Sequence, residues 1–163
     1  MQLVIPNWHP IAIHFAIGML LTATLLLLIT SAVRDMSWAP NATLVARWNL
    51  AMGVLAAAAA LATGYCAFST VRHDDPSHAN MVVHLRWAFG TTAAYSVVAL
   101  LAWLDRRRRA GAHIALAGLS FIAAAFLIVT AWYGARNTYE FGLGVQALPD
   151  IEHHHHGEHA HAD

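Results

Sequence analysis

Residues 11–33 read IAIHFAIGMLLTATLLLLITSAV, a run without a single Asp, Glu, Lys or Arg. At about 1.5 Å per residue, a helix of this length crosses a hydrocarbon core of about 30 Å. The run lacks the basic flank and the small-residue cleavage site of a secretory signal, so removal of this segment is not expected. We therefore predict a retained transmembrane helix.

Three more runs of helical length, nearly without charge, follow along the chain. They cover residues 48–69, 81–104 and 113–134. Backbone polar groups in lipid must be paired internally, so each run is predicted to be a helix. The short connection at 105–112 places neighbouring helices antiparallel. The predicted fold is all-α: an integral membrane four-helix antiparallel bundle, one domain over residues 1–145, followed by a disordered His-rich tail at 146–163.

The composition excludes several classes of function. Of the 163 residues, 58% are hydrophobic and 11% are charged. A soluble domain carries about a quarter of charged residues, so a soluble enzyme is not expected. Nine basic residues, all of them Arg, balance nine acidic ones, and the chain therefore lacks the positive field that holds a nucleic acid. The sequence predicts a multi-pass protein of the bacterial inner membrane that contacts lipid and no nucleic acid.

The arginines indicate which way the bundle faces. Six arginines lie in the first and third loops, namely Arg34, Arg47, Arg106, Arg107, Arg108 and Arg109. Three lie on the opposite side, namely Arg72, Arg86 and Arg136. Positively charged residues favour the cytoplasmic side of a membrane. Both termini are therefore predicted to face the periplasm.

The twelve histidines outnumber all the other basic residues, and most of them fall on the predicted outer side. His14 and His84 lie at matching depth, about one turn inside the first and third spans. An unsatisfied imidazole in lipid costs several kcal/mol. We therefore predict that the two rings are the axial ligands of a haem b iron. A bare metal ion, or a hydrogen bond from each ring to a neighbouring carbonyl, would satisfy the same residues.

His9 lies five residues before His14, so on a regular helix the two side chains point about 140° apart. One helix face cannot present both rings to the same ion. His9 is therefore interpreted either as a ligand of a second haem or metal centre, shared with a loop histidine, or as an interfacial residue beside Pro10. His113 has no candidate partner at its depth, which argues against a second haem at the inner face.

Three arginines lie on the same predicted side as the histidine pair. Because Arg binds carboxylates in a bidentate manner, Arg86, Arg72 and Arg136 are predicted to hold the haem propionates, with snorkelling of Arg86 to headgroups as the alternative. The tail carries six histidines with flanking acids, which suits weak binding of Cu, Zn or Ni. These are His153, His154, His155, His156, His159 and His161. A purification tag would have a longer unbroken run, so the tail is interpreted as native.

Two end motifs resemble a bacterial membrane family known as domain of unknown function twenty-two thirty-one. The opening NWHPIAIHFAIGML resembles its HP-x-x-x-HF-x-IG start, and the segment YGARNTYEFGLGV resembles its Gly-Gly, Val-Tyr and Gly-x-Gly-Val close. The resemblance covers about residues 8–145 and implies a four-helix fold with His9, His14 and His84 as signature positions. Ala135 replaces a family glycine, and Phe141 stands where many members carry His, so any role of that His is absent here.

The sequence predicts a b-type haem protein that transfers electrons near the periplasmic face and has no catalytic residue of its own. Its expected partners are a larger redox complex or a periplasmic cytochrome or cupredoxin, with quinol as a further candidate. One alternative is a membrane protein that binds or transports Cu, Zn or Ni through His9, His14, His78 and His84. Another is a cofactor-free structural subunit of a respiratory complex.

Overall fold

The computed structural model describes residues 8–107 and 111–145, which form four long helices joined by short connections. These are α1 (His9–Ala32), α2 (Ala39–Thr70), α3 (Asp75–Leu104) and α4 (Ile114–Tyr139), and a short 3-10 helix, η1 (Asp105–Arg107), continues α3. The described residues contain no strand. All four helices are long and apolar enough to span a membrane. The prediction of an all-helical membrane protein with four spans is thereby confirmed.

Each helix extends beyond the apolar run that predicted it. The second helix begins at Ala39 rather than at 48, and the third begins at Asp75 rather than at 81. Apolar runs mark only the part of a helix that suits lipid, whereas helical hydrogen bonds continue through the interface. Asp74 fixes the start of α3 by a capping box, because its carboxylate accepts the Ser77 N–H at 3.0 Å while the Ser77 hydroxyl oxygen accepts the Asp74 N–H at 3.0 Å.

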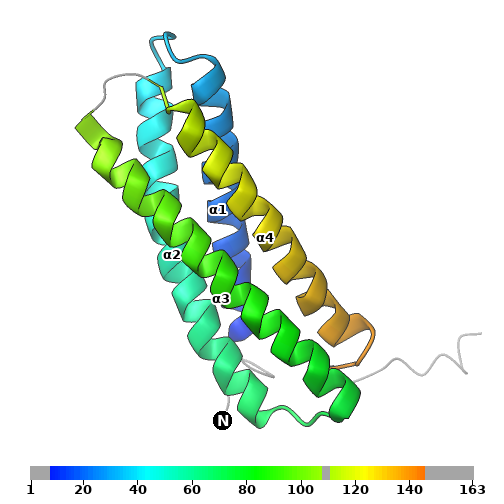
Figure 1. The fold of residues 1–163 in the computed structure, drawn as a ribbon. Coiled ribbons are helices and arrows are strands. Elements are labelled where there is room, and N and C mark those ends of the chain that lie inside the picture. Colours follow the sequence, from blue (N-terminus) through cyan, green and yellow to red (C-terminus); the bar gives the residue numbers. More distant parts are fainter. Residues whose placement is uncertain (1–7, 108–110, 146–163) are drawn as a thin grey trace, which may run out of the picture.

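The helices are arranged as two antiparallel pairs. Packing is most extensive between α1 and α2 and between α3 and α4. The contacts of α1 with α4 and of α2 with α3 are less extensive. Helices that follow each other in the chain run in opposite directions (Figure 1). In this arrangement α1 and α3 lie on opposite corners of the bundle. A residue on α1 can therefore meet a residue on α3 only across the bundle interior.

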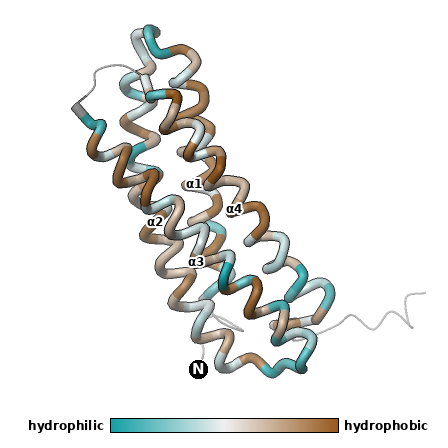
Figure 2. Tube along the Cα trace, in the orientation of Figure 1, coloured by the Kyte–Doolittle hydropathy of each residue, from teal (hydrophilic) through white to brown (hydrophobic). Residues whose placement is uncertain are grey.

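The two ends of the bundle differ in composition. The start of α1, the α2–α3 loop and the end of α4 lie at one end, here called the histidine end, and the α1–α2 and α3–α4 connections form the arginine end. Hydrophilic residues gather toward both ends, and the length between them is predominantly apolar (Figure 2). This distribution is the one that a bilayer selects, because charged groups remain in water while the middle faces hydrocarbon.

Small residues and a few hydroxyl groups fill the bundle interior. Leu20, Leu50 and Tyr95 are fully buried, and the Tyr95 hydroxyl lies 3.0 Å from Thr24 Oγ1, which links α3 to α1 across the interior. Gly53 provides space for the Leu20 side chain, since a Cβ atom there would lie 2.6 Å from Leu20 Cδ2. Many large apolar side chains point outward instead. Lipid contact of this outer surface follows from the four membrane-spanning helices.

Candidate functional site

His9 and His84 face each other at the histidine end. His9 is the first residue of α1 and His84 is the tenth of α3. Their ring centroids are 6.4 Å apart, and the ring planes are inclined at 80°. Both side chains are partly buried. The bundle therefore brings one imidazole from each helix pair to a common point in its interior.

Each ring is held by the second helix of its own pair. His9 Nδ1 lies 2.9 Å from the Ala60 carbonyl oxygen of α2, and His84 Nδ1 lies 3.0 Å from the Thr130 carbonyl oxygen of α4. A carbonyl oxygen only accepts, so Nδ1 is the protonated nitrogen in both rings. In the neutral imidazole the lone pair then resides on Nε2. This orientation, with Nδ1–H on a backbone carbonyl, is the one that second-shell contacts give to metal-ligating histidines.

A glycine lies behind each ring, four residues after the carbonyl that the ring contacts. A Cβ atom at Gly64 would lie 2.9 Å from His9 Cε1, and one at Gly134 would lie 3.0 Å from His84 Cε1. The carbonyl of residue i in a helix points toward residue i+4, so a side chain at i+4 stands beside any group that approaches this carbonyl. Glycine removes that obstacle. The same device, a carbonyl followed four residues later by glycine, thus occurs once in α2 and once in α4.

A polar network of α3 and α4 surrounds His84. Thr130 Oγ1 lies 2.7 Å from Thr91 Oγ1 and donates to the Phe126 carbonyl at 2.9 Å. One turn before His84, the Asn80 amide donates to the Tyr133 carbonyl at 3.0 Å and to Asn137 Oδ1 at 2.7 Å. Asn80 is only 6% exposed, so these bonds lie in the interior. They fix the rotation of α3 on α4 and with it the direction of the His84 ring.

His14 does not take part in this pair. Its side chain is exposed on the outer surface of α1, and its Nδ1 contacts the Pro10 carbonyl of the same helix. The ring beside His84 in the structure is therefore that of His9, whereas the sequence predicted His14. Depth along the helix predicted His14, but the 140° between His9 and His14 allows only one of them to face the interior. Because α3 begins earlier than expected, His84 lies deeper from its helix start and level with the start of α1.

The three arginines proposed for carboxylate binding have separate surroundings. Arg86 and Arg72 are exposed. Arg136 forms a bidentate ion pair with Glu140, with Nε–Oε2 and Nη2–Oε1 distances of 2.5 and 2.7 Å. Hydrogen bonds from this guanidinium lower the pKa of the Glu140 carboxyl. Arg136 therefore already binds a carboxylate of its own chain. Arg86 and Arg72 are the better candidates for binding haem propionates, which stays a prediction.

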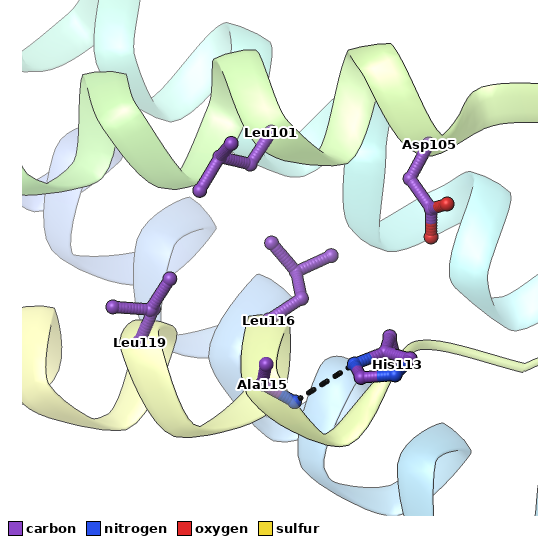
Figure 3. Close-up of a pocket in the computed structure, with 6 residues that line it drawn as sticks. All are labelled: Leu101, Asp105, His113, Ala115, Leu116 and Leu119. Carbon is purple, nitrogen blue, oxygen red and sulfur yellow. Dashed lines mark hydrogen bonds between the residues drawn. The ribbon is translucent and has the colours of Figure 1, made fainter.

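The arginine end carries a separate, open hollow of about 210 Å³ between the end of α3 and the start of α4 (Figure 3). Its lining is Leu101, Asp105, His113, Ala115, Leu116 and Leu119. His113 Nδ1 accepts the Ala115 N–H at 3.2 Å and so caps α4, which gives this histidine a structural role. Sites for larger organic ligands usually exceed about 300 Å³. The histidine pair, at the opposite end, is the stronger candidate site.

The residues that position the rings were not found from the sequence. Ala60 and Thr130 contribute backbone carbonyls, which have no side-chain signal, and Gly64 and Gly134 resemble the other glycines of the spans. The six tail histidines lie outside the described residues. Within residues 8–107 and 111–145, His, Cys, Asp and Glu side chains form no group of three or more arranged to hold a metal ion.

Comparison with known protein families gives a match over most of the chain. The profile of the family described as "Predicted membrane protein (DUF2231)" matches residues 6–147. No curated protein and no solved structure matches the chain. The family match covers all four helices and both histidines of the pair, and its description names no activity.

Proposed function

We propose that this chain, which belongs to the DUF2231 family of membrane proteins, is a b-type haem protein in which His9 and His84 are the axial ligands. The proposal keeps the haem expected from the sequence and changes one of its ligands. The observation that carries it is the proximity of the His9 and His84 imidazoles, whose centroids are 6.4 Å apart.

The separation agrees with two rings bound to opposite sides of one ion. With metal–nitrogen bonds of about 2 Å and about 1 Å from each ligating nitrogen to its ring centroid, opposed imidazoles have centroids about 6 Å apart. Two ring nitrogens also match the number of ligands that haem iron requires, since the porphyrin supplies the other four. Structural zinc, by contrast, takes four protein ligands. The pair therefore suits haem better than a bare zinc ion.

The arrangement of the helices supports a flat group at this position. One histidine comes from the α1–α2 pair and the other from the α3–α4 pair, and packing between the pairs is less extensive than packing within them. His9 and His84 would hold a bound haem from both helix pairs at once. Haem b exchanges single electrons, and the protein's contribution here is to hold two imidazoles by Nδ1–H bonds to carbonyls, which raises the basicity of Nε2.

The proposed role is electron transfer at the histidine end. The arginine distribution favours an orientation with this end at the periplasmic face of a bacterial inner membrane. The proposed partners there are a larger redox complex, a periplasmic cytochrome or cupredoxin, or quinol. Arg86 and Arg72 would contact the propionates, because both are exposed at this end and guanidinium binds carboxylate in a bidentate manner.

A reduced-minus-oxidised visible spectrum of the detergent-purified protein, reconstituted with haemin where needed, tests the proposal. We expect a b-type spectrum that His9→Ala and His84→Ala each abolish. His14→Ala is the matched control, since it removes a histidine from the same helix but from the lipid-facing surface, and it should retain full haem.

A second variant separates loss of the ligand from loss of the fold. His84→Met keeps a side chain that ligates haem iron, so it should retain a haem spectrum with a raised midpoint potential. Absence of any b-type spectrum in the wild type would overturn the proposal, as would full haem in His9→Ala. Stoichiometric copper without haem in the same sample would instead support metal binding by the pair.

A further inference from the structure

A second pair of histidines lies outside the bundle interior, in and after the α2–α3 loop. His73 belongs to the loop, and His78 is the fourth residue of α3. Their rings stack with centroids 5.1 Å apart and an interplanar angle of 18°. His73 Nε2 lies 3.0 Å from His78 Nδ1, and both side chains are exposed. Two imidazole nitrogens are thus joined by a hydrogen bond at the surface.

Local contacts hold both rings in this position. His73 Nδ1 lies 2.7 Å from the Val71 carbonyl oxygen, so Nδ1 carries the proton and Nε2 presents its lone pair to His78. The capping box of Asp74 and Ser77 fixes the first turn of α3, from which His78 projects. The Phe68 ring lies beside both imidazoles, with its centroid 5.3 Å from that of His78 and 6.2 Å from that of His73. The pair is therefore organised before any ligand binds.

We infer that His73 and His78 form a surface binding site for Cu²⁺. Two nitrogens bonded to one ion at about 2.0–2.1 Å are about 2.9 Å apart when the bonds are at right angles and about 3.4 Å apart when they are tetrahedral. The observed separation of 3.0 Å is that of a hydrogen bond between the two rings, and it is short enough for both nitrogens to reach one ion once the proton between them is displaced and the rings turn toward the ion. Right-angled nitrogen ligands are typical of tetragonal Cu²⁺, which also binds such ligands most strongly among the divalent first-row metals.

The proton balance and the local charge are both compatible with a bound cation. In the metal-free pair His78 Nδ1 donates a hydrogen bond to His73 Nε2. A bound metal ion would replace this proton, which would move through water to His78 Nε2. Binding would therefore release no net proton. Residues 72–78 contain Arg72, Asp74 and Asp75, a formal charge of −1 from one positive and two negative side chains when the histidines are neutral. Water would complete the coordination, so the ion would remain exchangeable with the surrounding solvent.

This site is independent of the proposed haem. It lies at the same end of the bundle as His9 and His84 but uses different residues, and its ligands face water rather than the bundle interior. Its test therefore does not depend on the outcome of the haem experiment.

The experiment is a Cu²⁺ titration of the full chain in which the six tail histidines are replaced by Asn, followed by electron paramagnetic resonance. We expect one Cu²⁺ per chain with hyperfine coupling to two nitrogens. His73→Asn and His78→Asn should each weaken binding at least tenfold and leave one coupled nitrogen. His113→Asn is the control, because it removes a histidine from the opposite end while Asn preserves the helix cap.

Zinc provides the second measurement. Since Cu²⁺ binds nitrogen ligands more strongly than the other divalent first-row metals, Zn²⁺ should bind at least tenfold more weakly than Cu²⁺. Unchanged Cu²⁺ affinity in both loop variants would overturn the inference. So would Zn²⁺ binding as tight as that of Cu²⁺, or loss of Cu²⁺ only in His9→Ala or His84→Ala.

Discussion

The glycines behind the two rings give the sharpest test of the histidine pair. Gly64→Ala and Gly134→Ala each add a single methyl group at a position that contacts an imidazole. Gly18→Ala and Gly118→Ala are matched controls, because a Cβ atom at either position would meet nothing within 4 Å outside its own helix. All four changes replace glycine with alanine in a membrane-spanning helix. Any difference between the two sets therefore reports on the rings.

The size of the effect follows from the distances. A methyl group at Gly64 would lie 2.9 Å from His9 Cε1 and 3.1 Å from Nδ1, whereas ordinary contacts are about 3.5–4.0 Å. The ring must therefore move by about 0.6 Å. Such a shift lengthens the Nδ1 contact with Ala60, now 2.9 Å, toward the limit of a hydrogen bond. At Gly134 the corresponding distances to His84 are 3.0 and 3.4 Å, so the displacement is smaller.

The free energies can be estimated from the same geometry. Overpacking by one methyl group costs about 1–3 kcal/mol. Alanine is favoured over glycine in a helix by about 0.5–1 kcal/mol. We expect Gly64→Ala to destabilise the bundle by about 1–2 kcal/mol and Gly134→Ala by somewhat less. Gly18→Ala and Gly118→Ala should be neutral or stabilising by up to about 1 kcal/mol.

Two assays test the stability and the haem affinity of these variants separately. Unfolding in mixed detergent micelles, followed by circular dichroism, measures the stability of the four variants, and a haemin titration measures the affinity of the pair. Equal stability of Gly64→Ala and Gly18→Ala would refute the contact between His9 and Gly64. A destabilised Gly64→Ala with haem affinity like the wild type would keep the contact and reject His9 as a ligand.

Three further predictions concern other parts of the bundle. Hydrogen bonds from Ser77 lower the pKa of the Asp74 carboxyl. The stabilisation of α3 by this carboxylate is therefore present above the ordinary Asp pKa and is lost as the pH falls through the lowered value. Amide exchange at the start of α3 should show this loss, and Asp74→Asn, which keeps a neutral cap, should abolish the pH dependence. Tyr95→Phe removes the hydrogen bond to Thr24 and should destabilise the bundle by about 0.5–1.5 kcal/mol in the same unfolding assay. Unchanged stability of this variant would contradict the prediction. Gly111→Ala would drive a methyl group into the Thr30 carbonyl oxygen, and size-exclusion chromatography should show much less monodisperse protein; a normal yield would show that the α3–α4 connection can move aside.

The fold was predictable because lipid restricts the choice so strongly. Four apolar runs of about the thickness of a bilayer must be helices, and short connections between them require antiparallel neighbours. The helix ends were less predictable. Hydropathy marks the part of α2 and α3 that suits hydrocarbon, but Ala39–Arg47 and Asp75–Asn80 are helical as well, since helical hydrogen bonds form equally well at the interface. The capping sequence around Asp74 was the available signal for the true start of α3.

The candidate site was predictable only in part. The sequence indicated that histidines gather at one end and that His84 needs a partner inside the bundle. It did not indicate which residue of α1 this partner is. The depth of a residue in the membrane can be estimated from its position along a span, whereas the side of the helix that faces the bundle interior cannot. His78 was named from the sequence as a candidate metal ligand, but its pairing with His73 was missed for a similar reason. Its geometry depends on the path of a loop whose residues, taken one by one, look like ordinary exposed polar positions.

By itself the sequence determined that this protein crosses a membrane four times, that its chain is helical, and that its histidines concentrate at one end. Only the tertiary structure decided that His9 rather than His14 meets His84, and that Gly64 and Gly134 provide space for the two rings. The physical reason is that these helices are apolar on every side. Residues that face lipid and residues that face a neighbouring helix are both mostly apolar, so hydropathy does not reveal the rotation of each helix about its axis, which helix packing sets.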